Sequence, residues 1–283
     1  MSEELTVTQV SAADRADCLE LTTRLGWNQL DADWKLFTEC GTALAMRCDG
    51  RIVGTAAAIG WEKRLAWIGL VLTVPEMRGR SIATTLMKAL IERYADHRTI
   101  KLDASAMGAP VYRKLGFRDE RRIIRLSLKQ PLEPAPERLH WEPMTGAVLP
   151  EVIKLEAGFT GMARPELYSY YLASYPALAQ VGRDATGAVA AWTLGRDGRI
   201  FRQAGALGAV DDDAALEAVR PFHAISPGTA IQLDIPEDRT AFLAALAALG
   251  FQTERDFLRM ALGEDCGDWS DRRTYAVFGP EMG

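Results

Sequence analysis

Apolar positions along the chain recur with two different periods, and these predict where strands and helices lie. Residues 65–74 are almost continuously apolar, which favours a strand covered on both faces. After a short turn, apolar residues recur every four positions, at Ile82, Leu86, Leu90 and Tyr94. This spacing predicts a helix from residue 81 with one face in the core. A buried strand therefore leads through a tight turn into an amphipathic helix.

The same patterns predict the other elements of the first 130 residues. We expect strands at 5–10, 42–48, 52–61, 65–74, 99–104 and 121–128. We expect helices at 12–25, 31–39 and 109–115, in addition to the one that begins at 81. Asp49-Gly50 between two of the strands is a strong hairpin signal. This order predicts an α/β (α+β) fold with a mixed, mostly antiparallel central sheet flanked by helices.

The chain also repeats part of its own sequence, which indicates two related domains. Residues 117–128 align without gaps to residues 251–262, and Ile100–Asp103 corresponds to Ile231–Asp234. Three prolines in 131–136 predict an extended connector between the copies. We therefore predict domains at 1–130 and 139–283, joined by 131–138. The second domain is expected to end in a strand near 274–278.

The turn before the helix of the first copy has the features of an anion site. The first turn of a helix has unpaired backbone N–H groups and a partial positive charge, so it attracts a phosphate group. Gly79 lets the backbone approach closely, while Arg78 and Arg80 add positive charge. An ordinary strand–helix connection with surface arginines is the alternative interpretation.

The corresponding turn of the second copy carries the opposite charge. Asp211, Asp212 and Asp213 stand at the expected start of a helix, and neither arginine nor glycine occurs between 210 and 216. Aspartates suit a helix start as caps, but they would repel a phosphate group. We expect the second domain to keep the fold and to lack the phosphate site.

Composition and charge narrow the class of protein. Hydrophobic residues make up 48% of the 283 and charged residues 25%, which is ordinary for a globular chain. A formal net charge of −5 argues against broad nucleic-acid binding. We also expect no signal peptide and no membrane span. The four cysteines, Cys18, Cys40, Cys48 and Cys266, form no Cys-x-x-Cys pair and the three histidines are scattered. We therefore expect reduced thiols, no metal site and a cytoplasmic protein.

Two segments of the first copy resemble one known family. The spacing Arg78-x-x-Ser81-x-Ala83 resembles the Arg/Gln-x-x-Gly-x-Gly/Ala signature of GCN5-related N-acetyltransferases, the GNAT family. Residues 102–117, which end in Tyr112-x-x-x-Gly-Phe, are similar to a second family segment at the right distance. Ser81 replaces a glycine of the signature. Because serine is small and a good helix N-cap, we expect the turn to tolerate Ser81 less well than glycine but still to bind its ligand. The two-domain layout resembles a bacterial subgroup with an acetyltransferase-like domain at the carboxyl end.

The resemblance implies acetyl-coenzyme A as the co-substrate. In the family, amides of the turn hold its pyrophosphate, and a backbone N–H near Leu72–Val74 polarises the thioester carbonyl. The implied cofactor-binding residues are Leu72, Thr73, Val74, Arg78, Gly79, Arg80, Ser81, Ile82, Ala83, Thr84 and Ser105. Tyr112 is implied as the proton donor to the departing thiolate, with core packing on the sheet as its alternative role.

The general base is not evident in the sequence. An alkyl ammonium is mostly protonated at neutral pH, so the acceptor has to lose a proton. Family members often place a glutamate on the strand before the turn, but residues 68–74 contain no carboxylate. Glu62, Asp33 and Glu39 are candidates, although each is better explained as a surface or structural acid, and a water relayed to backbone carbonyls is a further alternative. Asp103 has a counterpart, Asp234, in the copy without the phosphate turn, so we interpret Asp103 as structural.

The region that covers the acceptor in the family corresponds to residues 25–34. The implied acceptor-site residues are Trp27, Asn28, Gln29, Asp33, Trp34 and Trp61, although the indoles could instead be core anchors. In the second domain Tyr168, Tyr170, Tyr171 and Tyr175 predict an aromatic cluster, which we interpret mostly as core or interdomain packing.

The resemblance as a whole implies an acetyl-coenzyme A-dependent N-acetyltransferase. It would act on a small amine, an amino acid or a related metabolite by direct attack in a ternary complex. A protein N-acetyltransferase and a non-catalytic acyl-coenzyme A sensor are the alternatives. We expect a small-molecule amine as the partner, no nucleic acid and no membrane; a homodimer is compatible with the sequence.

Overall fold

The chain falls into two compact units that are discontinuous in sequence. The computed structural model describes residues 4–133, 135–225, 228–264 and 273–283. Unit 1 comprises Met1–Glu120, Leu258–Cys266 and Glu281–Gly283, and unit 2 comprises Arg121–Phe257 and Gly267–Pro280. Each unit is a largely antiparallel mixed sheet flanked by helices, so the predicted fold class is confirmed.

Unit 1 is built on the strand order β1-β2-β3-β4-β5-β12. Its strands are β1 (Leu5–Gln9), β2 (Thr42–Cys48), β3 (Arg51–Trp61), β4 (Leu65–Thr73), β5 (Thr99–Ala104) and the second half of β12 (Gln252–Gly263). β4 and β5 are parallel, whereas the other neighbours are antiparallel. Its helices are α1 (Arg15–Arg24), α2 (Asp31–Cys40), α3 (Ile82–Arg93) and α4 (Ala109–Lys114). The predicted bounds of the elements in residues 1–130 agree to within three residues.

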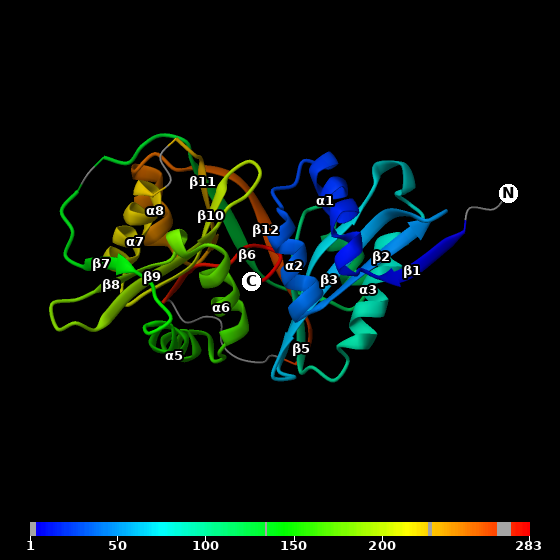
Figure 1. Cartoon of the computed structure of the whole chain (residues 1–283), viewed down its shortest axis with the longest axis horizontal. Helices are drawn as coiled ribbons and strands as arrows, with labels where there is room; N and C mark the ends of the chain where they lie inside the picture. The colour runs from blue at the N-terminus through cyan, green and yellow to red at the C-terminus, as the bar shows by residue number, and fades with distance from the viewer. Residues whose placement is uncertain (1–3, 134, 226–227, 265–272) are drawn as a thin grey trace. The chain divides into compact units, whose positions relative to one another are not determined.

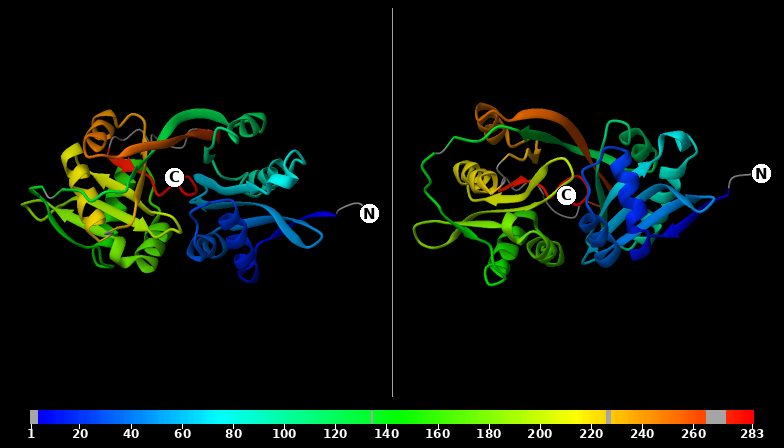
Figure 2. Two further views of the ribbon diagram at one scale, coloured as in Figure 1. Left: turned by 90° about the horizontal axis from the view of Figure 1, so that it is seen from above. Right: turned by 45° about the horizontal axis from the view of Figure 1, so that its top comes forward.

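The helices of unit 1 cover both faces of its sheet (Figure 1, Figure 2). Leu86 and Leu90 of α3 are fully buried against Ala56 and Ala58 of β3, whose small side chains let the helix lie close to the sheet. Because side chains of a strand alternate between faces, Ala66 and Ile68 of β4 join the same cluster. The intervening residues of β4 therefore lie on the opposite face of the sheet, which α1 and α2 help to cover through their contacts with β3.

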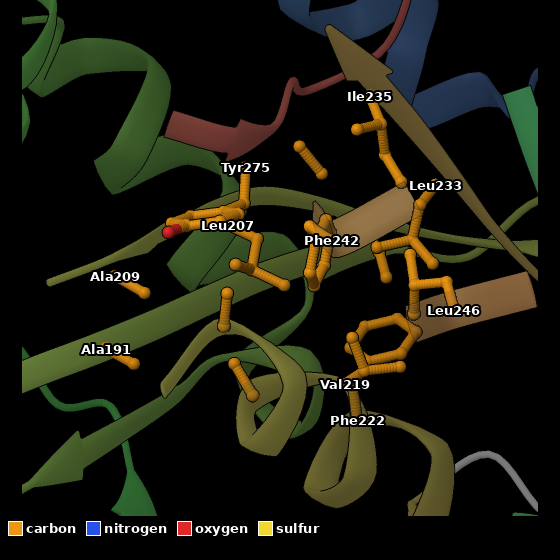
Figure 3. Packing of buried hydrophobic residues seen from close by; sticks show 14 of the residues in the cluster. Ala191, Leu207, Ala209, Val219, Phe222, Leu233, Ile235, Phe242, Leu246 and Tyr275 are labelled. Carbon is orange, nitrogen blue, oxygen red and sulfur yellow. The ribbon is translucent and has the colours of Figure 1, made fainter. Parts of the chain in front are cut away.

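Unit 2 repeats this arrangement with the strand order β12-β6-β11-β10-β9-β8-β7, and β13 pairs with β10. Its further strands are β6 (Arg118–Leu128), β7 (His140–Pro143), β8 (Gln180–Arg183), β9 (Val189–Arg196), β10 (Arg202–Ala209), β11 (Ile231–Pro236) and β13 (Thr274–Ala276). Its helices are α5 (Leu149–Thr160), α6 (Pro165–Ser174), α7 (Asp212–Ala224) and α8 (Thr240–Ala248). Phe222 of α7 and Phe242 of α8 pack against Leu207 and Leu233 of the sheet, as Figure 3 shows.

The two copies exchange their last strands. Antiparallel pairs from Leu258↔Ala104 to Gly263↔Thr99 join the end of β12 to β5 in unit 1. Reciprocally, pairs from Ile231↔Leu128 to Pro236↔Ile123 join β6 to β11 in unit 2. The sequence pattern located the strand at 121–128 correctly, but the structure places it in unit 2 rather than in the first domain. The predicted division at 131–138, of which residue 134 lies outside the described residues, stays a prediction.

Each exchanged strand brings an arginine to a buried aspartate of the other copy. In unit 1, Arg259 donates to both oxygens of Asp103 at 2.8 and 2.9 Å. In unit 2, Arg125 donates to both oxygens of Asp234 at 2.7 Å. Gln203 also donates to Asp234, at 3.0 Å. The interpretation of Asp103 as a structural residue is therefore confirmed.

Candidate active site

A bulge interrupts β4 shortly before the turn at 78–83 that is predicted to bind phosphate. Leu70 has φ 51°, and the register between β3 and β4 shifts so that Leu70 and Val71 lie opposite Ala56 alone. The hydroxyl of Thr55 donates to the Leu70 carbonyl at 2.9 Å and so holds the bulge in place. Bulges of this kind re-aim the residues that follow them.

The bulge decides which backbone N–H groups after it face β5. In the described part of the chain, β4 pairs with β5 only over Leu65–Trp67. The N–H of Val74 donates to the Val53 carbonyl at 2.9 Å and is therefore occupied. Since N–H directions alternate along a strand, the N–H of Thr73 points to the opposite edge, where this pairing has ended. Of the three predicted residues Leu72–Val74, Thr73 has the geometry of a carbonyl-polarising donor.

The start of α3 leaves backbone donors uncapped. The first backbone bond of the helix runs from the Thr85 N–H to the Ser81 carbonyl at 2.9 Å. The N–H groups of Ile82, Ala83 and Thr84 precede this bond and have no acceptor within the helix. Ser81 occupies the N-cap position, but its side chain makes no capping hydrogen bond, so the expected capping role of the serine side chain is wrong.

Backbone conformation explains why the family has glycine at the position of Ser81. Its φ of 60° and ψ of 16° lie in the left-handed region, which disfavours residues with a Cβ atom by roughly 1–2 kcal/mol. Gly79 also has a positive φ, of 80°. These two residues bend the chain so that the free N–H groups of α3 and the exposed side chains of Arg78 and Arg80 flank one turn. The arrangement suits a phosphate group.

Tyr112 lies on α4, buried beside α3. Its side chain is 8% exposed and packs 6.2 Å from the ring of Phe117. A Cβ atom at Gly108 would lie 2.9 Å from the Tyr112 ring, so this close approach requires glycine. Burial raises the pKa of the Tyr112 hydroxyl well above its usual value of 10, which keeps the hydroxyl protonated at neutral pH. Ser105 accepts a hydrogen bond from the Gly108 N–H at 3.2 Å and so orders the turn before α4.

The predicted acceptor-site residues differ in burial: one is half-buried and the others are buried. Trp27 is half-buried and packs against Leu72 and Val74 at the end of β4. Trp34 and Trp61 are buried, as their alternative role of core anchors predicts, and Asn28 is 7% exposed. Asp33 accepts a hydrogen bond from the Leu30 N–H at 2.7 Å and thereby caps α2.

Sequence reasoning missed one acid on this side of β4. Glu281 belongs to unit 1, is 8% exposed and accepts a hydrogen bond from Gln29 Nε2 at 2.5 Å. A Cβ atom at Gly69 would lie 2.6 Å from the Glu281 Cα, so the segment Glu281–Gly283 runs directly against β4. The only signal in the sequence was Gly69 itself, because a glycine within an apolar strand often marks a close backbone approach.

At the equivalent helix start in unit 2, aspartate side chains of the helix's own first residues take up the hydrogen bonds. Asp211 is the N-cap of α7 and accepts a hydrogen bond from the Ala214 N–H at 2.8 Å. Arg138 forms an ion pair with Asp211, and Tyr275 donates to Asp212 at 2.6 Å. Burial opposes ionisation of Asp211, but the hydrogen bond from Ala214 and the charge of Arg138 outweigh it and lower the pKa. The predicted capping role of the aspartates is confirmed at Asp211.

Several other predictions concern groups away from this site. The aromatic cluster of unit 2 forms around Phe278, which Tyr168 and Tyr171 approach edge-on at 5.1 and 4.7 Å.

Burial raises the pKa of the Cys18 thiol to about 12, whereas Cys266 lies outside the described residues. Among the described residues, no three His, Cys, Asp or Glu side chains gather as metal ligands would. Within the same residues, every helix is too short or too polar to cross a membrane.

Family models match both halves of the chain. One described as "Acetyltransferase (GNAT) family" matches residues 12–117, and one described as "Acetyltransferase (GNAT) domain" matches residues 152–276. The chain belongs to the GNAT acetyltransferase family. The turn at Arg78–Ala83 lies inside the first match, and the aspartate-capped start of α7 lies inside the second.

Solved structures show the same tandem GNAT fold. A protein from Pyrococcus horikoshii, described provisionally as an acetyltransferase, is 20% identical with a TM-score of 0.82, over 100% of this chain and 97% of that one. A GCN5-related N-acetyltransferase from Sphaerobacter thermophilus is 16% identical with a TM-score of 0.64, over 92% and 97%. A tandem GNAT protein from the clavulanic acid biosynthesis pathway is 16% identical with a TM-score of 0.65, over 93% and 100%. No curated protein sequence matches significantly.

Proposed function

We propose that this GNAT protein is an acetyl-coenzyme A-dependent N-acetyltransferase for a small amine, and that unit 1 is its catalytic half. The observation that carries the proposal is the start of α3, where the N–H groups of Ile82–Thr84 have no acceptor within the helix and directly follow two exposed arginines, Arg78 and Arg80. Family membership supports acetyl transfer and acetyl-coenzyme A as the acyl donor. The residues of the turn fit the pyrophosphate of that donor, since a helix start and arginine side chains both favour phosphate.

Thr73 and Tyr112 each have a part in the proposed acyl transfer. The donor supplies an activated thioester. The N–H of Thr73 lies on the open edge of β4, where it can donate to the thioester oxygen as negative charge develops. The protonated hydroxyl of Tyr112 can give a proton to the departing sulfur. Direct attack by the amine then needs no covalent enzyme intermediate.

A panel of primary amines tests this proposal by colorimetric detection of released thiol. We expect turnover with at least one small amine, and a 10- to 100-fold lower kcat for Tyr112→Phe with unchanged affinity for acetyl-coenzyme A by calorimetry. Full activity of Tyr112→Phe would leave Tyr112 a packing residue only. Binding of acetyl-coenzyme A without thiol release for every small amine would contradict the proposed function. In that case a lysine-containing peptide distinguishes a protein acetyltransferase from an acyl-coenzyme A sensor.

A further inference from the structure

Glu281 and Gln29 form a small buried cluster with unused hydrogen-bonding capacity. Glu281 Oε1 accepts from Gln29 Nε2, but among the described residues Glu281 Oε2 and Gln29 Oε1 have no partner. The two residues are 8% and 2% exposed. Buried polar atoms are nearly always hydrogen-bonded, so two orphaned acceptors on one hydrogen-bonded pair of side chains point to a missing donor. A primary ammonium group, with three N–H donors and a positive charge, has the matching chemistry.

The position of this cluster is set by three elements of unit 1. The backbone of Glu281 lies against Gly69, the residue immediately before the bulge at Leu70. Gln29 lies in the segment between α1 and α2, where Trp27 packs on Leu72 and Val74. The orphaned oxygens therefore belong to residues that approach β4 just ahead of Thr73, on the face that α1 and α2 cover.

The other acids of unit 1 that were considered as the general base are either hydrogen-bonded within the protein or exposed to solvent. Asp33 caps α2, and both oxygens of Asp103 accept hydrogen bonds from Arg259. Glu39 and Glu62 are exposed at the surface. Glu281 combines burial, a free oxygen and contact with β4.

We propose that Glu281 is the general base of the reaction and that Gln29 positions it. This rests on the proposed function. The Glu281 carboxylate takes one proton from the acceptor ammonium and later passes it to solvent. The freed lone pair forms the C–N bond at the thioester carbon, and the C–S bond breaks with its electron pair going to sulfur. Tyr112 protonates the sulfur, and the second proton lost by nitrogen restores the Tyr112 hydroxyl. One proton is released for each amide formed.

Two nucleophiles of nearly the same shape separate this role from a structural one. Phenethylamine is protonated at neutral pH, whereas O-benzylhydroxylamine is not and needs no base before it attacks. For Glu281→Gln, we expect kcat/KM to fall at least 100-fold with phenethylamine and to stay within about threefold with O-benzylhydroxylamine. The remaining phenethylamine rate should rise about tenfold per pH unit, as the free amine does. Gln29→Leu should show the same selective loss, but smaller.

Control variants keep the test independent of folding. Glu264→Gln changes an exposed glutamate of unit 1 that pairs with Arg98, and it should leave both rates unchanged. Glu281→Asp keeps a carboxyl group, so it should retain the wild-type pH profile at a reduced rate and serves if Glu281→Gln does not fold. Thermal unfolding and acetyl-coenzyme A affinity are measured for every variant.

The outcomes distinguish this inference from the proposed function on which it rests. An equal loss with both nucleophiles, in folded Glu281→Gln that binds acetyl-coenzyme A normally, overturns the role of Glu281 and leaves the acetyltransferase standing. An unchanged rate with phenethylamine does the same. If wild-type protein releases thiol with no amine or hydroxylamine, the proposed function fails and the assignment of Glu281 fails with it.

Discussion

The two halves start the same helix with opposite electrostatics. In unit 1, α3 begins at a left-handed serine that follows Arg78 and Arg80, and the side chain of this serine makes no capping hydrogen bond. In unit 2, α7 begins at Asp211, whose own carboxylate accepts from the Ala214 N–H and pairs with Arg138. A helix start that attracts anions can therefore be kept open for a ligand or filled from within. The fold is compatible with both, so the proposed phosphate site is a property of the turn rather than of the fold.

What the halves share is equally informative. Both retain a buried, bidentate Arg–Asp pair between the penultimate strand of one copy and the exchanged strand of the other. Arg259 also lies over the ring of Trp67 at 4.6 Å, and Arg125 over the ring of Phe257 at 4.9 Å. Residues that serve the architecture recur in both copies, whereas the residues proposed to bind the acyl donor occur in one.

Separating the copies should have the largest effect on this comparison. A chain of residues 1–130 lacks the end of β12, which pairs with β5, and lacks Glu281–Gly283. We expect it to show no cooperative unfolding transition by circular dichroism. Restoring residues 252–264 through a flexible linker after residue 120 should recover a transition. A cooperative, stable 1–130 fragment would show that the exchanged strand is dispensable.

Removing the aspartate of either buried pair should be the next largest effect. Asp103→Ala and Asp234→Ala each leave an arginine buried without its partner, which typically costs about 3–5 kcal/mol. We expect the loss to be larger for Asp234, because Gln203 loses its acceptor as well. Urea unfolding measures both, and Asp119→Ala at the exposed pair with Arg113 is the control. A loss below about 1 kcal/mol in either variant would contradict a structural role.

Reversing the charge of the open turn should affect binding without affecting stability. We expect Arg78→Glu to weaken acetyl-coenzyme A binding by roughly 100-fold or more in calorimetry, about 2.7 kcal/mol, since it replaces a phosphate contact with repulsion. Arg113→Glu alters an exposed arginine of the same unit and should bind normally. Equal affinities for the two variants would place the pyrophosphate elsewhere.

Removing the cap of the closed turn should have the smallest effect, with a defined pH dependence. Asp211→Ala should lower the free energy of unfolding by about 1 kcal/mol at pH 7 and leave acetyl-coenzyme A affinity unchanged. Because folding lowers the pKa of Asp211, its contribution is present above the unfolded pKa near 4 and is lost as pH falls through the folded pKa. The difference from wild type should therefore shrink in acid. A constant difference down to pH 3 would argue against the ionised cap.

Local patterns predicted the elements, the turn and the role of Asp103, because each depends on residues close in sequence or on the internal repeat. The exchange of β6 and β12 was not predictable, since a strand has the same alternation whichever sheet it joins. Glu281 was missed for a related reason. The segment Glu281–Gly283 is too short to show a periodic pattern of apolar residues, and its contact with Gly69 forms only in the folded structure.

Exchange of the last strands also delays the completion of unit 1 during protein synthesis. Residues 1–120 leave the ribosome before the end of β12 exists, and the stretch 121–257 must be translated first. At about 5–20 residues per second this takes roughly 7–30 seconds. During that interval the edge of β5 has no partner strand, which is the kind of exposed edge that invites aggregation. Nascent unit 1 is therefore expected to depend on chaperones until the distal half of the chain emerges.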